Sequence, residues 1–278
     1  MRSTRNFRER LFASGGPRMT AAQLVRIDAS ALRLCLPTFE SVTSLRLVGI
    51  SIVNVNEYTS FRDALMAMKS MTLLELQMDR LDLAASSRLP ILMPTIQSLF
   101  VRNAYVFSGW VEIPPIHAGA LVVLWLEGSL NTEAIEKQLP LLQHLILNYP
   151  DYLKLDRMSR AFPQIQRLTS PSLDSDYSVH QILAAIGTGY RVGDDTFAGR
   201  SGMLWPRLHT IAGADRTGVS GCGMLRNTIS ELQAAGHPIC KLMLTNVLHA
   251  HIDADMAELR KVVEVEEYSL GWPTPFKW

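Results

Sequence analysis

The sequence has few cysteines and no long run of apolar residues. Its three cysteines, Cys35, Cys222 and Cys240, are widely separated among 278 residues and form no Cys-x-x-Cys pair. This distribution excludes a disulfide-dense secreted scaffold and favours a reducing, intracellular location, either cytoplasmic or nuclear. The longest apolar run, residues 120–126, is seven residues long, whereas a helix needs about 20 to cross a bilayer. We therefore expect no membrane-spanning segment.

The chain also lacks an excess of charge of either sign. Lysine and arginine number 27 and aspartate and glutamate 26, so the net charge is +1. A globally basic nucleic-acid binder is excluded, and we expect neither a nucleic-acid nor a membrane partner. Apolar residues make up 47% and charged residues 19%, a composition that predicts a folded chain. Residues 1–20, rich in arginine, are predicted to be a disordered basic arm ahead of a folded domain over 21–278.

Leucine, in contrast, is abundant and recurs in a pattern. A six-residue frame of the form apolar, x, x, Leu, x, apolar occurs eight times, and leucine fills its fourth position in seven of the eight. Composition alone would supply about one leucine there. A ninth, weaker frame includes Val262 and Val265. The frames open at Val42, Met71, Ile96, Leu121, Leu142, Ile165, Leu208 and Ile239.

The spacing of the frames predicts the fold class. Successive frames are 29, 25, 25, 21, 23, 43 and 31 residues apart, close to the 20–29 residues of leucine-rich repeats. Four follow a proline by two residues, which suits a corner leading into a strand. Helices are expected between frames, at 57–69, 132–138, 179–186, 224–235 and 253–262. We therefore predict an α/β leucine-rich-repeat solenoid, a horseshoe with eight or nine short parallel strands and helices or irregular segments on its convex side. The longest gap predicts an insertion loop at about 187–203.

The frames and three further segments resemble the leucine-rich-repeat portion of fungal F-box proteins of the basidiomycete type. The segments are 205–211 (WPRLHTI), 232–242 (LQAAGHPICKL) and the closing 263–268 (VEVEEY) with 272–276 (WPTPF). The resemblance covers residues 31–278. It implies a non-enzymatic, protein–protein interaction solenoid similar to the substrate-recognition part of an SCF ubiquitin ligase.

An F-box itself is not visible. Its Leu-Pro-x-Glu-like opening has one counterpart near the start, Leu36-Pro37, and this runs straight into the first repeat frame. Binding of a Skp1-type adaptor is therefore not predicted for any residue, and the expected partner is an unknown target protein. No phosphate-binding glycine motif is recognisable, so no cofactor is expected.

Residues that flank the inward leucines on each strand should face the concave surface, because side chains alternate along a strand. We expect this mixture of charged and aromatic side chains to bind a partner, with Phe100, Arg102 and Trp125 as anchors. The alternative is that Trp125 and Phe100 pack under a neighbouring loop or an absent domain. The row comprises Ser44, Arg46, Glu75, Gln77, Ser98, Phe100, Arg102, Val123, Trp125, Glu127, His144 and Ile146, and its predicted partner-binding members are Arg46, Gln77, Phe100, Arg102, Trp125, Glu127 and His144.

Two alternatives stay open. His249 and His251, followed by Asp253 and Asp255, are spaced so that two histidines on a strand would share a face, as in some metal-dependent hydrolases. Catalytic zinc generally needs a third protein ligand, and no further motif supplies one, so no metal site is predicted. The other alternative is a structural remnant without a dedicated partner.

Overall fold

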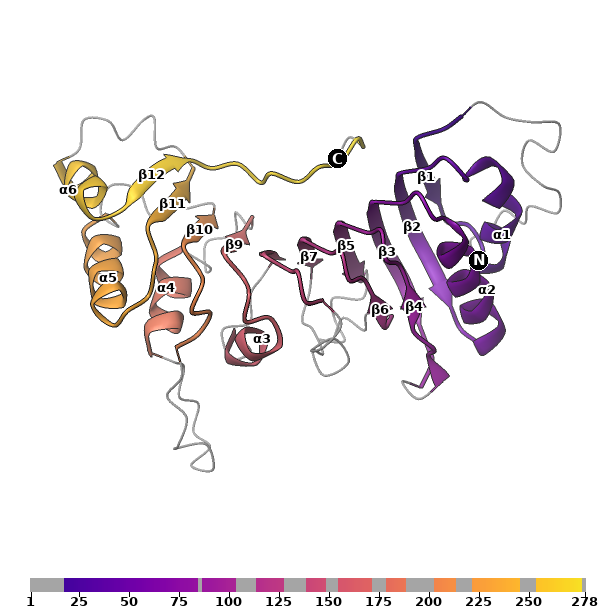
Figure 1. Cartoon of the computed structure of the whole chain (residues 1–278), viewed down its shortest axis with the longest axis horizontal. Helices are drawn as coiled ribbons and strands as arrows, with labels where there is room; N and C mark the ends of the chain where they lie inside the picture. Colours follow the sequence, from indigo (N-terminus) through magenta and orange to yellow (C-terminus); the bar gives the residue numbers. More distant parts are fainter. Residues whose placement is uncertain are drawn as a thin grey trace. The chain divides into compact units, whose positions relative to one another are not determined.

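A computed structural model of the chain describes residues 18–84, 87–103, 114–127, 139–148, 155–171, 179–188, 203–213, 222–245 and 254–276. The chain divides into two compact units. The first comprises residues 1–141 together with 272–278, and the second comprises residues 142–271. Both units combine parallel strands with helices, so the fold is α/β, as the frames predicted (Figure 1). No helix among the described residues is long and apolar enough to cross a membrane.

The first unit has five parallel strands in the order β1-β2-β3-β5-β7, and β4 and β6 form a separate parallel pair. Helix α2 packs beside α1 and β4. Two 3₁₀ turns, Ala29–Ala31 and Leu36–Thr38, flank α1. The elements are β1 (Ala21–Val25), α1 (Leu32–Cys35), β2 (Ser44–Ile52), α2 (Val55–Ala67), β3 (Leu73–Leu81), β4 (Ile91–Leu92), β5 (Ser98–Asn103), β6 (Ile116–His117) and β7 (Val123–Glu127).

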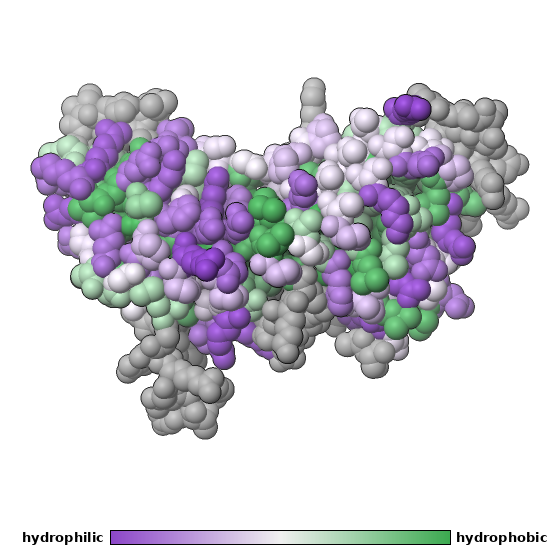
Figure 2. Space-filling model, in the orientation of Figure 1, coloured by the Kyte–Doolittle hydropathy of each residue, from purple (hydrophilic) through white to green (hydrophobic). Residues whose placement is uncertain are grey.

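The second unit also has five parallel strands, in the order β8-β9-β10-β11-β12. Helix α4 packs beside α5, and α5 beside α6 (Figure 1). Hydrophilic residues predominate around α6 on the surface in view (Figure 2). The elements are β8 (His144–Asn148), α3 (Leu155–Ala161), β9 (Arg167–Ser170), α4 (Val179–Thr188), β10 (Thr210–Gly213), α5 (Cys222–Ala234), β11 (Lys241–Leu244), α6 (Ala254–Val262) and β12 (Glu264–Glu267).

The frame leucines align within each unit. Every one of the eight frames begins a strand at its third position. In the first unit the strand register forms a column of leucines, in the order Leu45, Leu74, Leu99 and Leu124. In the second unit the column runs through Leu145, Leu168, Ile211, Leu242 and Val265. The eight residues at the fourth frame position are all buried. Burial of this apolar column between neighbouring strands contributes to the core of each unit.

The entry into each strand repeats as well. The carbonyl at the second frame position accepts two backbone N–H groups from the next frame: Thr43 O, for example, accepts from Thr72 N (2.9 Å) and Leu73 N (3.0 Å). The same arrangement is found at Thr72, Gln97, Gln143, Gln166 and His209. These bonds satisfy the backbone where the chain bends into the sheet.

Turns before the frames explain the prolines. Ile96 N donates to Met93 O, Ile165 N to Phe162 O and Leu208 N to Trp205 O, each closing a four-residue turn. Pro94, Pro163 and Pro206 occupy the second place of these turns, where the fixed φ of proline fits best. The first residue of each turn is apolar and buried: Phe39, Met68, Met93, Ala118, Phe162 and Trp205. This additional apolar position, three residues before the frame, is a sequence signal that the six-residue frame omits.

Helices α2, α4, α5 and α6 correspond to the predicted helices at 57–69, 179–186, 224–235 and 253–262, whereas α1 and α3 were not predicted. α2 begins two residues earlier than expected because Asn54 and Glu57 form a reciprocal cap: Glu57 N donates to Asn54 Oδ1 (2.9 Å), and Val53 N donates to Glu57 Oε2 (2.9 Å). α5 ends at Ala234, one residue before its predicted end, and Gly236 follows with a φ of +94°; His237 N donates to Leu232 O at 2.9 Å.

Some expectations need correction or lie outside the described residues. β1 extends the first unit by a strand that no leucine frame marked, with Ala22 opposite Leu45. The predicted loop at 187–203 begins two residues too early, because α4 includes Gly187 and Thr188. Residues 1–17 of the predicted arm, residues 189–202 of the loop and the helix predicted at 132–138 are outside the described residues.

Candidate partner-binding site

Four residues of the first unit form one row across neighbouring strands. The register places Arg46 of β2 opposite Glu75 of β3, then Phe100 of β5 and Trp125 of β7. Each occupies the fifth frame position, next to the buried leucine at the fourth, so strand alternation turns it to the opposite face of the sheet. We call these four residues the first-unit face. It combines one cation, one anion and two aromatic rings.

The first-unit face is covered, so of the two alternatives for Phe100 and Trp125 the structure shows packing under another segment. Arg46 is 6% exposed, Glu75 1%, Phe100 3% and Trp125 7%. The cover includes residues 272–276 at the C-terminal end of the chain, which belong to the same compact unit. We call these residues the C-terminal segment.

Trp272 supplies the aromatic part of the cover. Its ring lies 5.5 Å from that of Trp125 and 6.3 Å from that of Phe100, and Phe100 and Trp125 are 4.8 Å apart; all three pairs are edge-to-face. Edge-to-face pairs at these centroid separations are favourable beyond the area that they bury. The indole Nε1 of Trp272 donates a hydrogen bond to Oε1 of Glu75 at 2.8 Å. The segment is therefore held by packing and by one directed hydrogen bond.

Charge on the face is paired. Nε of Arg46 donates to Oε2 of Glu75, and both side chains are nearly inaccessible. The guanidinium of Arg46 also lies 4.8 Å from the centre of the Phe276 ring, within the range of a cation–π contact. Glu75 thus accepts from Arg46 with one oxygen and from Trp272 with the other. A buried carboxylate with both oxygens bonded is far less costly than an isolated one.

The remaining predicted residues of the first unit lie two positions further along their strands. Gln77, Arg102 and Glu127 are paired in register, and Arg102 and Glu127 form an ion pair at 3.5 Å. All three are partly exposed. They give the covered face a polar and accessible rim.

His144, the last predicted binding residue, belongs to the second unit and is buried. Its Nε2 shares a hydrogen bond with Oγ1 of Thr169 at 2.8 Å. Burial, assisted by the charge of Arg167, lowers the pKa of His144 from 6.5 to about 3. A neutral, enclosed histidine is a packed side chain, so its predicted place on an exposed binding surface was wrong.

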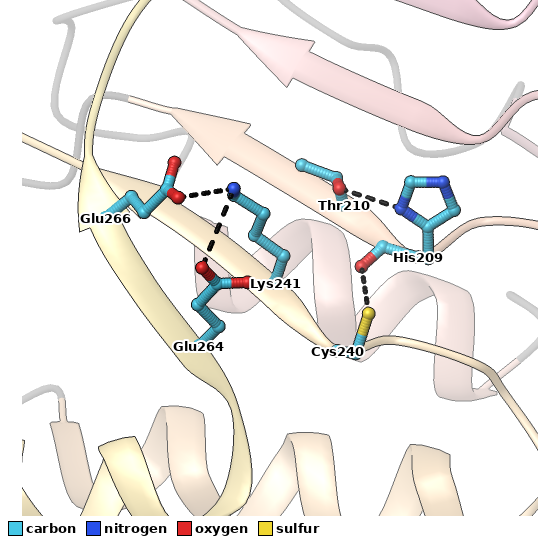
Figure 3. A network of polar contacts seen from close by, with 6 residues as sticks. All are labelled: His209, Thr210, Cys240, Lys241, Glu264 and Glu266. Carbon is cyan, nitrogen blue, oxygen red and sulfur yellow. Dashed lines mark hydrogen bonds and ion pairs between the residues drawn. The ribbon is translucent and has the colours of Figure 1, made fainter.

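Polar residues of the second unit pair with one another across the strands. Lys241 Nζ lies 2.5 Å from Oε1 of Glu266 and 3.8 Å from Oε1 of Glu264 (Figure 3). The hydrogen bond between Lys241 and Glu266 raises the pKa of the lysine and lowers that of Glu266. Nearby, Nδ1 of His209 and Oγ1 of Thr210 are 2.9 Å apart, and the Cys240 thiol donates to His209 O at 3.8 Å. Of these residues Thr210 is buried, and the other five are partly or fully exposed.

Arg167 connects the second unit's strands to the chain after β12. It donates to Ser269 O and to Oγ1 of Thr169, the latter at 3.3 Å. Burial lowers the pKa of Arg167, and burial raises the pKa of Tyr268 to about 12. Both groups remain in their ordinary protonation states near neutral pH, so neither is suited to proton transfer there.

The metal-like cluster of the sequence is not tested. His249 and His251 lie outside the described residues. Across the part of the chain that the structure describes, no group of three histidine, cysteine, aspartate or glutamate residues is placed to hold a metal ion. Cys35 and Cys222 are buried, and Cys240 is exposed as a free thiol.

Sequence reasoning found the strand residues of the site but did not identify the segment that covers them. Glu75 was in the expected row without a role, although it stands one frame after Arg46 with the opposite charge. Trp272 and Phe276 were noted only as part of the closing segment that carries the family resemblance. Two aromatic residues separated by Pro273 and Pro275 were the available signal, since such a segment has little helix or strand propensity and much apolar surface.

Comparisons with known proteins do not assign the chain to a family. Neither a scan of protein-family models nor a search of curated proteins finds a match to this chain.

Proposed function

We propose that this chain is a non-enzymatic leucine-rich-repeat solenoid that recognises a partner protein through its strand face and adjoining loops. The in-register leucine columns and the repeated strand entries support the repeat architecture. Repeat proteins of this kind commonly bind along the strand face, because each repeat contributes side chains to one continuous surface.

One observation carries the proposal: the first-unit face holds a polypeptide segment, residues 272–276, that lies in neither a helix nor a strand. It does so with an indole hydrogen bond to Glu75, an arginine over Phe276, and the rings of Phe100 and Trp125. Tryptophan and arginine are the residue types enriched at energetically dominant positions of protein interfaces. A surface built in this way is suited to binding peptide rather than to chemical transformation.

The family resemblance refines the proposal. As the repeat part of an F-box-type protein, the chain would select a target for an SCF ubiquitin ligase inside the cell, in the cytoplasm or nucleus. No residue here is assigned to a Skp1-type adaptor. The widely spaced cysteines, reduced among the described residues, support the intracellular location.

Affinity capture followed by reconstitution tests the proposal. The full chain is used to capture interacting proteins, and the strongest one is purified and titrated against the chain. Replacing both anchors, Trp125→Ala with Arg102→Ala, should weaken binding at least about tenfold, since truncated anchors commonly remove more than 1 kcal/mol. Arg102→Glu, at the partly exposed rim, tests the face with little change to buried packing.

Arg80→Ala is the matched control. Arg80 is an exposed arginine at the end of β3 that pairs with Asp82, so its removal should leave binding unchanged. Circular dichroism shows whether each variant keeps its helix and strand content. Undiminished binding by both the double variant and Arg102→Glu would contradict the proposal.

A further inference from the structure

The C-terminal segment occupies the first-unit face as a ligand would. Its described backbone hydrogen bonds are internal: Thr274 N donates to Trp272 O at 3.0 Å, and Phe276 N donates to Oγ1 of Thr274 at 3.2 Å. None of residues 272–276 lies in a strand. Pro273 and Pro275 have no N–H to offer to a sheet edge. The segment is therefore recognised through its side chains, which makes the contact dependent on sequence.

We propose that the first-unit face recognises a partner segment of the pattern Trp-Pro-x-Pro-Phe, and that residues 272–276 are a resident ligand which the partner displaces. The inference rests on the proposed function, because it assumes that the chain has a protein partner. It adds the chemistry of the segment that the partner must present.

Glu75 sets the first requirement, an indole. Its side chain is 1% exposed and its Oε2 is engaged by Arg46, so the covering group must offer a donor to Oε1. Trp272 meets this need with Nε1 while its ring packs against Phe100 and Trp125. Phenylalanine would fill part of the space but would leave a buried carboxylate oxygen without that donor, which is the expensive outcome.

Arg46 sets the second requirement, an aromatic ring four residues later. The face of the Phe276 ring receives the guanidinium at 4.8 Å, and Arg46 is itself held by Glu75. The indole and the second aromatic ring are therefore both recognised by the Arg46–Glu75 ion pair. The two prolines fix the spacing between the rings and reduce the entropy lost when the segment becomes ordered.

The resident segment should compete with any added ligand. It is part of the same polypeptide, and a tethered ligand acts at an effective concentration in the millimolar range. An external segment of the same sequence must displace it, so the intact chain should bind such a segment weakly. Disabling the resident segment should expose the site.

A fluorescent peptide provides the test. The probe is capped Gly-Trp-Pro-Thr-Pro-Phe, which corresponds to residues 271–276, and its anisotropy is measured against the full-length chain. We expect the full-length Trp272→Ala/Phe276→Ala variant to bind the probe at least tenfold more tightly than the unmodified chain. A probe with phenylalanine in place of tryptophan should bind that variant about tenfold more weakly, the effect of losing a hydrogen bond to a charged acceptor.

Two further variants place the binding on the first-unit face. Adding Trp125→Ala to the double variant should abolish probe binding, whereas adding Arg80→Ala should not change it. Trp272→Phe keeps an aromatic ring over the face, so it remains informative if the double variant does not fold. It should bind the probe more tightly than the unmodified chain and less tightly than the double variant.

The outcomes separate this inference from the proposed function. Equal binding of the probe by the unmodified chain and both resident-segment variants, or no binding by any of them, would overturn it. So would a dimer of the unmodified chain that is lost in the double variant, because the segment would then come from a second copy. A purified partner that still requires Trp125 and Arg102 in any of these cases would leave the proposed function standing.

Discussion

The two units share a backbone pattern and differ in the side chains that their strands turn away from the leucine columns. At the fifth frame position the first unit has Arg46, Glu75, Phe100 and Trp125, whereas the second has Ile146, Thr169, Ala212 and Met243, with Glu266 on its last strand. The first row is buried beneath aromatic residues of the C-terminal segment. Ile146, Thr169, Ala212 and Met243 are buried as well, whereas Glu266 is partly exposed and pairs with Lys241.

The comparison shows that the frame constrains one face and leaves the other free. Leucine at the fourth position is required in both units because it fills the interior. The fifth position faces away from that interior, so large aromatic and charged residues are accommodated without changing the register. The side-chain chemistry of this face can therefore differ between strands whose backbone pairing is alike.

The largest difference should appear when the acidic residue of each row is removed. Glu75→Ala leaves the Arg46 guanidinium buried without its carboxylate and should lower the free energy of unfolding by about 3–5 kcal/mol. Glu266→Gln in the second unit removes an exposed partner of Lys241 and should have no measurable effect. Urea unfolding followed by circular dichroism measures both.

Glu75→Gln separates charge from shape in this experiment. It preserves the size of the side chain and an oxygen able to accept from Trp272, so it should be less destabilising than Glu75→Ala. Equal unfolding midpoints for Glu75→Ala and Glu266→Gln would show that the two rows contribute equally to stability, which would contradict the expected difference between the two units.

The second difference is in pH dependence. His144 has a pKa of about 3 in the folded chain and about 6.5 when unfolded, so the unfolded state binds more protons between these values. Stability is full above pH 6.5 and falls as pH is lowered toward 3; at pH 5 this histidine should remove about 2 kcal/mol. His144→Gln should flatten the unfolding free energy over pH 5–7.

The unmodified chain and His144→Gln are compared at pH 7 and pH 5 by urea unfolding. Burial also lowers the pKa of His237, and this contribution cancels because both proteins retain it. Ser98 holds the same frame position in the first unit and does not titrate, so Ser98→Ala serves as the control and should retain the full pH slope. An unchanged slope in His144→Gln would contradict the buried, neutral state of His144.

The smallest effects are expected at two glycines with positive φ. Gly49, φ +73°, lies where the β2–β3 register shifts, and an added Cβ would come within 2.9 Å of Cγ of Arg26. Gly49→Ala should lower the free energy of unfolding by about 1–2 kcal/mol. At Gly271, φ +64°, the nearest atom is 3.6 Å away, so only backbone strain remains and about 1 kcal/mol is expected.

Thermal and urea unfolding of the two glycine variants give the comparison. Gly119→Ala is the control for loss of glycine itself, because an added Cβ meets nothing within 4 Å and its φ is not in the left-handed region. A midpoint for Gly49→Ala as high as that for Gly119→Ala would show that the register shift tolerates a side chain.

The strands were the most predictable part of the fold. All eight frames begin strands, because an apolar residue at fixed positions of a repeated unit must be buried against its neighbours. β1 was missed because Ala22 and Leu24 carry too little of the pattern. The short helices α1 and α3 were missed too, since a helix of a few residues is stabilised by its surroundings rather than by its own sequence.

The candidate site was predictable only in part. Arg46, Phe100 and Trp125 were expected on one row because the frame fixes which side chains share a face. For Phe100 and Trp125 the sequence left exposure and burial under another segment open, and His144 was assigned to a surface although it is enclosed. Both outcomes have one cause: periodicity gives the direction of a side chain from its own strand but says nothing about what lies above it.

The sequence by itself determined the repeating strand, its inward leucines and the corners marked by proline, since each depends on residues close together in the chain. Tertiary structure alone decided that Trp272 meets Glu75, a residue 197 positions earlier. That hydrogen bond depends on the path of the entire chain between them, and no local pattern of residues encodes the path. The repeated frames therefore determine which side chains lie on the strand face, whereas the tertiary structure determines which segment covers them.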